Sequence, residues 1–171
     1  MEQSAQTMDQ AIKTARIKTG KYLTFTLDDE EYGIGILKVK EIIGMMPITS
    51  VPRTPEFVKG VINLRGKVIP VMDLRIKFDM TAIPYTERTC IIVVEIDSEE
   101  GTVLIGIVVD SVSEVLNIQE NEIEETPAFG TRLNTEYILG MAKTGGGVKI
   151  LLYIEKVLSA QEIISLEKAA D

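Results

Sequence analysis

Short apolar stretches separated by polar turns run through most of the chain. Four or five such β-rich stretches fall in each half, at a spacing of roughly 8 to 12 residues that is typical of small all-β domains. This pattern predicts one small antiparallel barrel in each half and does not favour a parallel sheet. Residues 1–20 are polar and lack the pattern, which predicts a mobile N-terminal tail.

One stretch of the sequence occurs twice. Residues 33–43 read GIGILKVKEII and residues 106–116 read GIVVDSVSEVL. Aligned without a gap, they share a glycine, an isoleucine, a valine and a glutamate, and Val39 meets Val112. Repetition at this length predicts an internal pseudo-repeat with Val39 and Val112 at equivalent positions. Chance similarity between two apolar strands is the alternative.

A second block recurs in the same order. Residues 54–61 (TPEFVKGV) and 134–141 (NTEYILGM) each predict a short helical turn that ends at a glycine, with Phe57 or Tyr137 turned inward. A hairpin is predicted after each block, and Pro70 argues for an edge or bulge position in the first one. Barrels of about sixty residues are marginal alone, so the two are predicted to share an apolar seam.

The C-terminal pattern changes to that of a helix. In LSAQEII, Ser159 is a predicted N-cap, Glu162 completes a capping box, and Leu158 with Ile163 forms a hydrophobic staple. The predicted organisation is a tail at 1–20, a first barrel at 21–85, a second barrel at 86–157, and a C-terminal helix at 158–171 that packs on the barrels. Exchange of end strands between the barrels is left open.

Composition and charge limit the class of protein. The 171 residues are 45% hydrophobic and 26% charged, as in soluble globular chains. No apolar run approaches the roughly 18 residues of a membrane span, and the first twenty residues lack a signal-peptide core, so a cytoplasmic protein is expected. Cys90 is the only cysteine and is predicted to pack as a small hydrophobe. The net charge of −8 argues against a nucleic-acid partner.

Little catalytic chemistry is open to this sequence. The chain has no histidine, which removes Ser-His-Asp and Cys-His catalysis and histidine zinc sites. The acidic run QENEIEE at 119–125 leaves a carboxylate-dependent hydrolase or a small-ligand barrel as the alternative function, although such a run is typical of a solvated face. KTGGGVK at 143–149 has its lysine on the wrong side of the glycines for a phosphate loop and predicts a hairpin turn. No metal or cofactor is predicted.

Arg65 stands out in the stretch GVINLRGKVIPVMDLR at 60–75. Arg65 and Gly66 occupy a predicted tight turn between two apolar strands, where a long cation is displayed near a sheet edge. The residues alone leave three interpretations open: a plain surface residue, an ion-pair partner for Asp73 or Glu41, or a recognition residue.

Four stretches carry a resemblance to a known family. EYGIGILKVKEI, TPEFVKGVINLRGKVIPVMDLRIKF, IGIVVDSVSEVL and LNTEYILGM, with their spacing, closely resemble the CheW family of bacterial chemotaxis coupling proteins over about residues 21–166. The same domain occurs in the kinase CheA and in the adaptor CheV. This chain lacks the kinase, phosphotransfer and receiver domains of those proteins, which favours a free-standing coupling protein.

The resemblance implies a fold and a function. The expected fold class is all-β, with two SH3-like five-stranded antiparallel β-barrels and a C-terminal helix. The expected function is that of a non-enzymatic adaptor that couples chemoreceptors (methyl-accepting chemotaxis proteins) to the histidine kinase CheA. The implied partners are the regulatory domain of CheA and the cytoplasmic receptor tips, and the isolated protein is expected to be a monomer that is recruited to membrane-anchored arrays.

The resemblance also implies roles for single residues. By position, Val39, Glu41 and Ile42 would contact the kinase, although Val39 is nearly as well explained as core. A groove between the barrels would take a receptor helix on an aliphatic floor with polar clamps at its margin; the residues carried to it are Arg65, Cys90, Val112 and Val115. Gly60, Gly66 and Gly106 would maintain backbone geometry.

Overall fold

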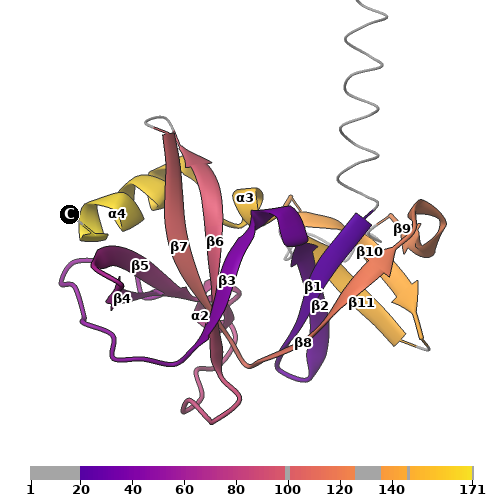
Figure 1. Ribbon diagram of the computed structural model, residues 1–171, viewed down its shortest axis with the longest axis horizontal. Coiled ribbons are helices and arrows are strands. Elements are labelled where there is room, and N and C mark those ends of the chain that lie inside the picture. Colours follow the sequence, from indigo (N-terminus) through magenta and orange to yellow (C-terminus); the bar gives the residue numbers. More distant parts are fainter. Residues whose placement is uncertain (1–19, 99–100, 126–135, 146, 171) are drawn as a thin grey trace, which may run out of the picture.

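The computed structural model describes residues 20–98, 101–125, 136–145 and 147–170. These residues form two β-sheets that lie side by side, with three short helices around them (Figure 1). The predicted N-terminal tail lies outside the described residues except for Gly20. Within the described part, no helix is long and apolar enough to cross a membrane.

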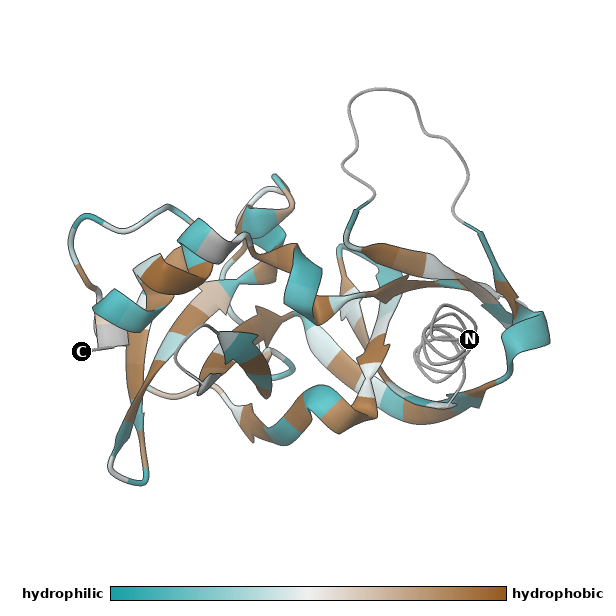
Figure 2. Ribbon diagram, turned by 90° about the horizontal axis from the view of Figure 1, so that it is seen from above, coloured by the Kyte–Doolittle hydropathy of each residue, from teal (hydrophilic) through white to brown (hydrophobic). Residues whose placement is uncertain are grey.

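The first sheet has six strands in the order β8-β1-β2-β11-β10-β9. Hydrophobic positions are interspersed with hydrophilic ones along the strands (Figure 2). The strand β1 is nevertheless buried on both faces, because the consecutive residues 22–25 are each at most 2% exposed. Its strands are β1 (Gly20–Leu27), β2 (Glu30–Gly35), β8 (Ser111–Ile118), β9 (Ile123–Glu124), β10 (Ile138–Thr144) and β11 (Gly147–Leu152).

The second sheet has five strands in the order β3-β6-β7-β5-β4. Its strands are β3 (Val39–Gly44), β4 (Val58–Leu64), β5 (Lys67–Asp73), β6 (Cys90–Ser98) and β7 (Gly101–Val109). The helices are α2 (Leu74–Lys77), α3 (Ile154–Val157) and α4 (Ala160–Ala170), and two 3₁₀ turns, η1 (Ile36–Lys38) and η2 (Glu120–Glu122), precede β3 and β9.

The two sheets repeat one arrangement. Without β9, the order β8-β1-β2-β11-β10 has the same form as β3-β6-β7-β5-β4. Gly33 pairs with Leu151 in the first sheet as Gly106 pairs with Val71 in the second. The first sheet combines β1 and β2 with β8 to β11, and the second combines β3 to β5 with β6 and β7. Strands are therefore exchanged between the two halves of the sequence, a possibility that the sequence analysis left open.

The expectation of two five-stranded antiparallel barrels is confirmed only in its coarse form, a mostly β fold with two sheets. Both sheets are open, and each contains one parallel pair, β2 with β11 and β5 with β7. Parallel neighbours need a long crossover connection. Such a connection runs from Gly35 to Gly147 between β2 and β11, and from Asp73 to Gly101 between β5 and β7. Hydrophobic periodicity records which residues are buried but carries no information on strand direction.

Two local predictions also differ from the structure. Residues 54–57 form a turn closed by the hydrogen bond from Val58 N to Pro55 O (3.0 Å), without a helix. Gly60 lies inside β4 at a bulge in its register with β5. Pro70 is in β5, an interior strand; its missing N–H is tolerated because pairing with β7 begins one residue later, at Val71.

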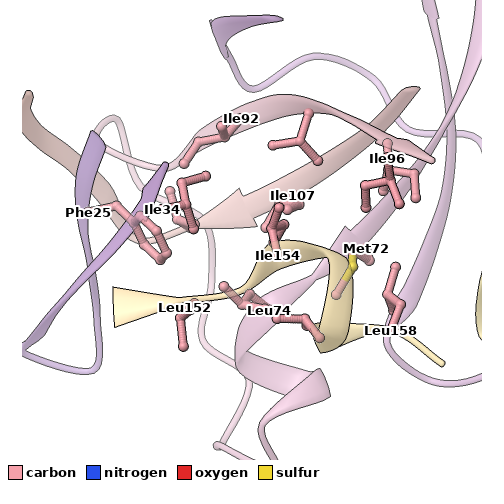
Figure 3. Packing of buried hydrophobic residues seen from close by; sticks show 14 of the residues in the cluster. Phe25, Ile34, Met72, Leu74, Ile92, Ile96, Ile107, Leu152, Ile154 and Leu158 are labelled. Atoms are coloured by element: carbon pink, nitrogen blue, oxygen red, sulfur yellow. The ribbon is translucent and has the colours of Figure 1, made fainter. Parts of the chain in front are cut away.

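A single apolar cluster joins the two sheets, which confirms the predicted shared seam. Phe25 and Ile34 of the first sheet face Ile92 and Ile107 of the second, and Leu152 joins them (Figure 3). All five side chains are at most 3% exposed, and fully burying one such side chain contributes about 1.5–3 kcal/mol. The shared cluster therefore holds the two sheets together as one folding unit.

The C-terminal helix begins as predicted. Ser159 N donates to Glu162 Oε1 (2.8 Å) and Glu162 N donates to Ser159 Oγ (3.1 Å), which is a capping box. Leu158 and Ile163 both pack in the shared cluster. The helix lies on the second sheet against β4 and β5 (Figure 1), and Lys77 forms an ion pair with Glu162.

Candidate functional site

The turn between β4 and β5 displays Arg65. Arg65 and Gly66 both have positive φ angles (51° and 88°), the conformation of a two-residue type I′ hairpin. Asn63 stabilises the turn by accepting a hydrogen bond at Oδ1 from Gly66 N (2.9 Å). The exposed guanidinium of Arg65 forms an ion pair with Glu41 on β3, so of the two ion-pair partners considered from the sequence the structure shows Glu41.

Arg65 and Glu41 line a cleft of about 630 Å³ on the second sheet. We call it the β3–β5 cleft. Its apolar lining comes from Leu64, Ile69, Val93 and Leu104, and its polar and charged lining from Lys40, Glu41, Arg65, Lys67, Glu95 and Thr102. A surface that combines apolar side chains with charged ones is typical of a protein-binding site.

A second ion pair lies at the same cleft. Lys40 Nζ is 2.6 Å from Glu95 Oε2, and this hydrogen bond lowers the pKa of Glu95. The sequence reasoning did not select either residue. A bulge in the register of β3 with β6, between Val39 and Glu41, accompanies the presence of both Lys40 and Glu41 at the cleft. Neither this bulge nor the cross-strand partner of Lys40 could be named before β6 was placed beside β3.

The three residues that the resemblance assigns to the kinase contact all lie on β3. Glu41 lines the β3–β5 cleft, and Ile42 is 43% exposed. Val39 is only partly buried and packs against the shared cluster, so it has both a core contact and some accessible surface.

The residues that the resemblance assigns to the receptor groove lie at two different sites in the structure. Arg65 lines the β3–β5 cleft with Glu41, whereas Cys90, Val112 and Val115 are not among the residues of that cleft. Cys90 is on β6, and Val112 and Val115 are on β8, an edge strand of the first sheet. Cys90 and Val112 are partly buried against the shared cluster, and Val115 is 50% exposed. We call Cys90, Val112 and Val115 the junction set, because its members come from both sheets.

The three glycines of the prediction have different environments. A Cβ at Gly60 (φ 143°) would lie 2.0 Å from Thr49 O, and one at Gly106 would lie 2.9 Å from Ile91 Cγ2. A Cβ at Gly66 would meet no atom within 4 Å. Gly60 therefore permits the close approach of the Thr49 backbone, and Gly106 permits that of the Ile91 side chain. Gly66 is required only for its turn conformation.

The acidic run at 119–125 does not form a recessed carboxylate pair. Glu122 accepts a hydrogen bond at Oε1 from Gln119 N (2.9 Å) within η2. Glu124 forms an ion pair of 2.7 Å with Lys143, and both side chains are largely exposed. Among the residues that the structure describes, no group of three or more acidic or cysteine side chains could hold a metal ion. These carboxylates have ordinary surface roles, and the geometry for hydrolysis is not found here.

A smaller hollow of about 400 Å³ is lined by residues of β1, β2, η1, β10, β11 and α3. Tyr22, Ile36, Leu139 and Ile154 contribute to its largely apolar lining, and Leu37 at its rim is 93% exposed. None of the predicted site residues lines this hollow.

Comparison with known proteins places the chain in a family. Residues 21–162 match the CheW-like domain, and the chain belongs to this family of non-enzymatic chemotaxis scaffold proteins. The chemotaxis protein CheW of Klebsiella aerogenes is 44% identical over 150 residues, which are 88% of each chain. CheW of Thermotoga maritima is 31% identical and covers 83% of this chain and 89% of its own.

A solved structure shows the same fold. The crystal structure of the scaffolding protein TtCheW from Thermoanaerobacter tengcongensis superposes with a TM-score of 0.73 at 37% identity, covering 84% of this chain and 97% of that one. The family and the mostly β fold were thus correctly predicted from the four sequence stretches.

Proposed function

We propose that this protein couples chemoreceptors to the histidine kinase CheA and so controls kinase activity in chemotaxis arrays. The observation that carries the proposal is the β3–β5 cleft, which the ion pair of Glu41 and Arg65 lines together with apolar side chains. The family's scaffold role supports it. We interpret each open sheet as a variant of the SH3-like barrel, and residues 20–170 as one functional unit.

The kinase regulatory domain is the proposed partner of the β3–β5 cleft. Glu41 and Arg65 contribute charged side chains, and Ile42 on the same strand as Glu41 offers an exposed aliphatic side chain. Because Arg65 pairs with Glu41, we assign Arg65 to this surface and not to the receptor contact. An exposed ion pair adds little affinity, but its charges favour a complementary partner and a defined register.

The helical tip of a receptor is the proposed partner of the junction set. Val112 and Val115 are three residues apart on β8, and Cys90 adds a small apolar side chain from β6. Aliphatic side chains of this kind suit the apolar face of a docked helix. Each contact can be weak, because an array repeats it many times at high effective concentration. The protein would then join these arrays from the cytoplasm as a monomer.

Arg65→Glu tests the coupling role. We would measure phosphorylation of the cognate response regulator by a mixture of receptor fragments and CheA, with and without this protein. The wild type should raise kinase output strongly, and Arg65→Glu, which places two carboxylates together, should lose most of that gain. Lys143→Glu, which disrupts an exposed pair on the other sheet, is the matched control and should keep it.

Three other results would count against the proposal at different levels. No gain with the wild type and competent partners would overturn the coupling function. Full activity of Arg65→Glu would keep that function and remove Arg65 from the kinase surface. Equal losses in Arg65→Glu and Lys143→Glu would show that net charge, and not the cleft, is what matters.

A further inference from the structure

Arg75 makes the most extensive set of polar contacts between the two sheets. It lies in α2, directly after β5 of the second sheet. Its Nε and one terminal nitrogen donate to the two carboxylate oxygens of Asp110, each at 2.8 Å. The same nitrogen is 3.4 Å from Asp28 Oδ1 in the turn between β1 and β2 of the first sheet. One side chain thus connects the second sheet, the β7–β8 connection and the first sheet.

The rest of the Arg75 environment holds the guanidinium in place. Its other terminal nitrogen donates to Thr81 O (2.8 Å), and its backbone N–H donates to Asp73 Oδ1 (2.9 Å). Asp110 also accepts a hydrogen bond from Asp28 N (2.9 Å). The side chain of Arg75 is 9% exposed and that of Asp110 is 22% exposed, so the pair is largely removed from water and its geometry is fixed on both sides.

Charge and burial agree with a tight pair. Burial alone would raise the pKa of Asp110, but the hydrogen bonds from Arg75 and from Asp28 N outweigh burial and leave that pKa below its ordinary value. Asp110 in turn raises the pKa of Arg75. Both groups are therefore charged in the folded protein at neutral pH.

The pseudo-repeat shows that this pair is not a requirement of the fold. In the other copy, the position of Arg75 is held by Glu155, and the position of Asp110 is held by Leu37. Leu37 is 93% exposed, and Glu155 forms a 3.1 Å ion pair with Lys38 in which both side chains are at least one-third exposed. Of these two corresponding places, both within the described residues, the one with Arg75 and Asp110 has the buried, two-pronged pair.

The pair lies directly beside the junction set. Asp110 follows Val109, which pairs with Cys90, and it precedes Val112 by two residues. Its backbone N–H also donates to Thr26 O of β1 (3.1 Å). In Figure 1, α2 lies close to the point where the β7–β8 connection leaves the second sheet. The distance from Cys90 on one sheet to Val112 and Val115 on the other therefore depends on how Asp110 is held.

We infer that Arg75 is a positioning residue for receptor binding: by fixing Asp110 and Asp28, it sets the relative placement of the two sheets and so assembles the junction set. This inference rests on the proposed receptor contact. The β3–β5 cleft is formed by strands of the second sheet alone. Arg75 therefore supports receptor binding and is not needed for kinase binding.

The test compares two affinities of the full chain. Arg75→Lys keeps the charge but cannot make the two-pronged contact, and Asp110→Asn keeps the shape but removes the charge. Lys149→Met is the matched control, because Lys149 is also 9% exposed and its ion pair with Glu31 joins β11 to β2 within one sheet. Titration calorimetry would measure binding of a receptor-tip fragment and of the CheA regulatory domain to each variant.

We expect Arg75→Lys and Asp110→Asn to weaken receptor-tip binding about tenfold, within the usual range of coupling between sites, and to leave kinase-domain binding within about twofold. Lys149→Met should lower stability without separating the two affinities. Spin labels at Lys67→Cys and Asn117→Cys in a Cys90→Ser background should show a broader distance distribution between the sheets when Arg75 is replaced.

The possible failures are distinct. The inference would be overturned if Arg75→Lys and Lys149→Met both weakened receptor-tip binding and kinase-domain binding to the same extent. Arg75 would then contribute only to stability. Unchanged receptor binding in a folded Arg75→Lys variant would also overturn it. If the wild type binds no receptor tip, it is the proposed receptor contact that fails, and the spin-label measurement alone then decides whether Arg75 fixes the sheets.

Discussion

Replacement of Gly60 by alanine gives a sharp test of how β4 is built. Thr49 and Val61 exchange two backbone hydrogen bonds, Thr49 N to Val61 O and Val61 N to Thr49 O, both at 2.9 Å. The backbone of residues 49 and 50 passes over Gly60 so closely that a Cβ would lie 2.0 Å from Thr49 O and 2.7 Å from Thr49 C. No real Cβ can occupy that space, so the segment must move away from β4.

The cost has two parts. The positive φ of 143° at Gly60 disfavours alanine by about 1–3 kcal/mol. Displacement of the Thr49 segment loses two hydrogen bonds, each contributing about 0.5–1.5 kcal/mol. We therefore expect Gly60→Ala to lower the free energy of unfolding by about 2–6 kcal/mol, and the upper part of this range is large for a single substitution.

Gly66→Ala is the matched control. Gly66 also has a positive φ (88°), but a Cβ there would meet no atom within 4 Å, so only the conformational cost of about 1–3 kcal/mol remains. Urea unfolding followed by circular dichroism would measure both variants. If Gly60→Ala costs no more than Gly66→Ala, the close approach of Thr49 is not important for stability and the reasoning is refuted.

Two further predictions concern the helix and the buried ion pair. Ser159→Ala removes the capping box of α4 and should lower the free energy of unfolding by about 0.5–2 kcal/mol in urea; an unchanged midpoint would show that packing alone fixes the start of the helix. The pKa of Asp110 is lower in the folded protein than its ordinary 3.8, so its ionised form contributes stability above pH 3.8 that is lost as the pH falls through the folded pKa. The difference in unfolding free energy between wild type and Asp110→Asn should therefore shrink below pH 3.8, and a constant difference down to pH 2 would contradict the assigned pKa shift.

Much of the architecture could be predicted because it depends on local patterns. The capping box needs only Ser159 and Glu162 at the right spacing, and the hairpin turn needs only Arg65-Gly66 between two apolar strands. The pseudo-repeat correctly placed Gly33 and Gly106 at equivalent strand positions. These features involve residues close in sequence, or a comparison of the sequence with itself.

The exchange of strands could not be predicted, because it depends on contacts between distant residues. Nothing in GIGILKVKEII states that β3 leaves its own half and pairs with β6. The same limit applies to the candidate site. Glu41 and Arg65 were both selected, but for different surfaces, and Arg75 was passed over because its partner Asp110 lies 35 residues away in sequence.

The exchange of strands has a consequence for synthesis on the ribosome. In the first sheet, Tyr32 of β2 pairs with Ile150 of β11, so the early strand β2 remains without this neighbour until almost the whole chain has been translated. The second sheet needs nothing beyond β7 and can form earlier. For the seconds that translation of the intervening residues takes, β2 has an unpaired edge, which is the situation in which chaperone binding or strand swapping between nascent chains is favoured.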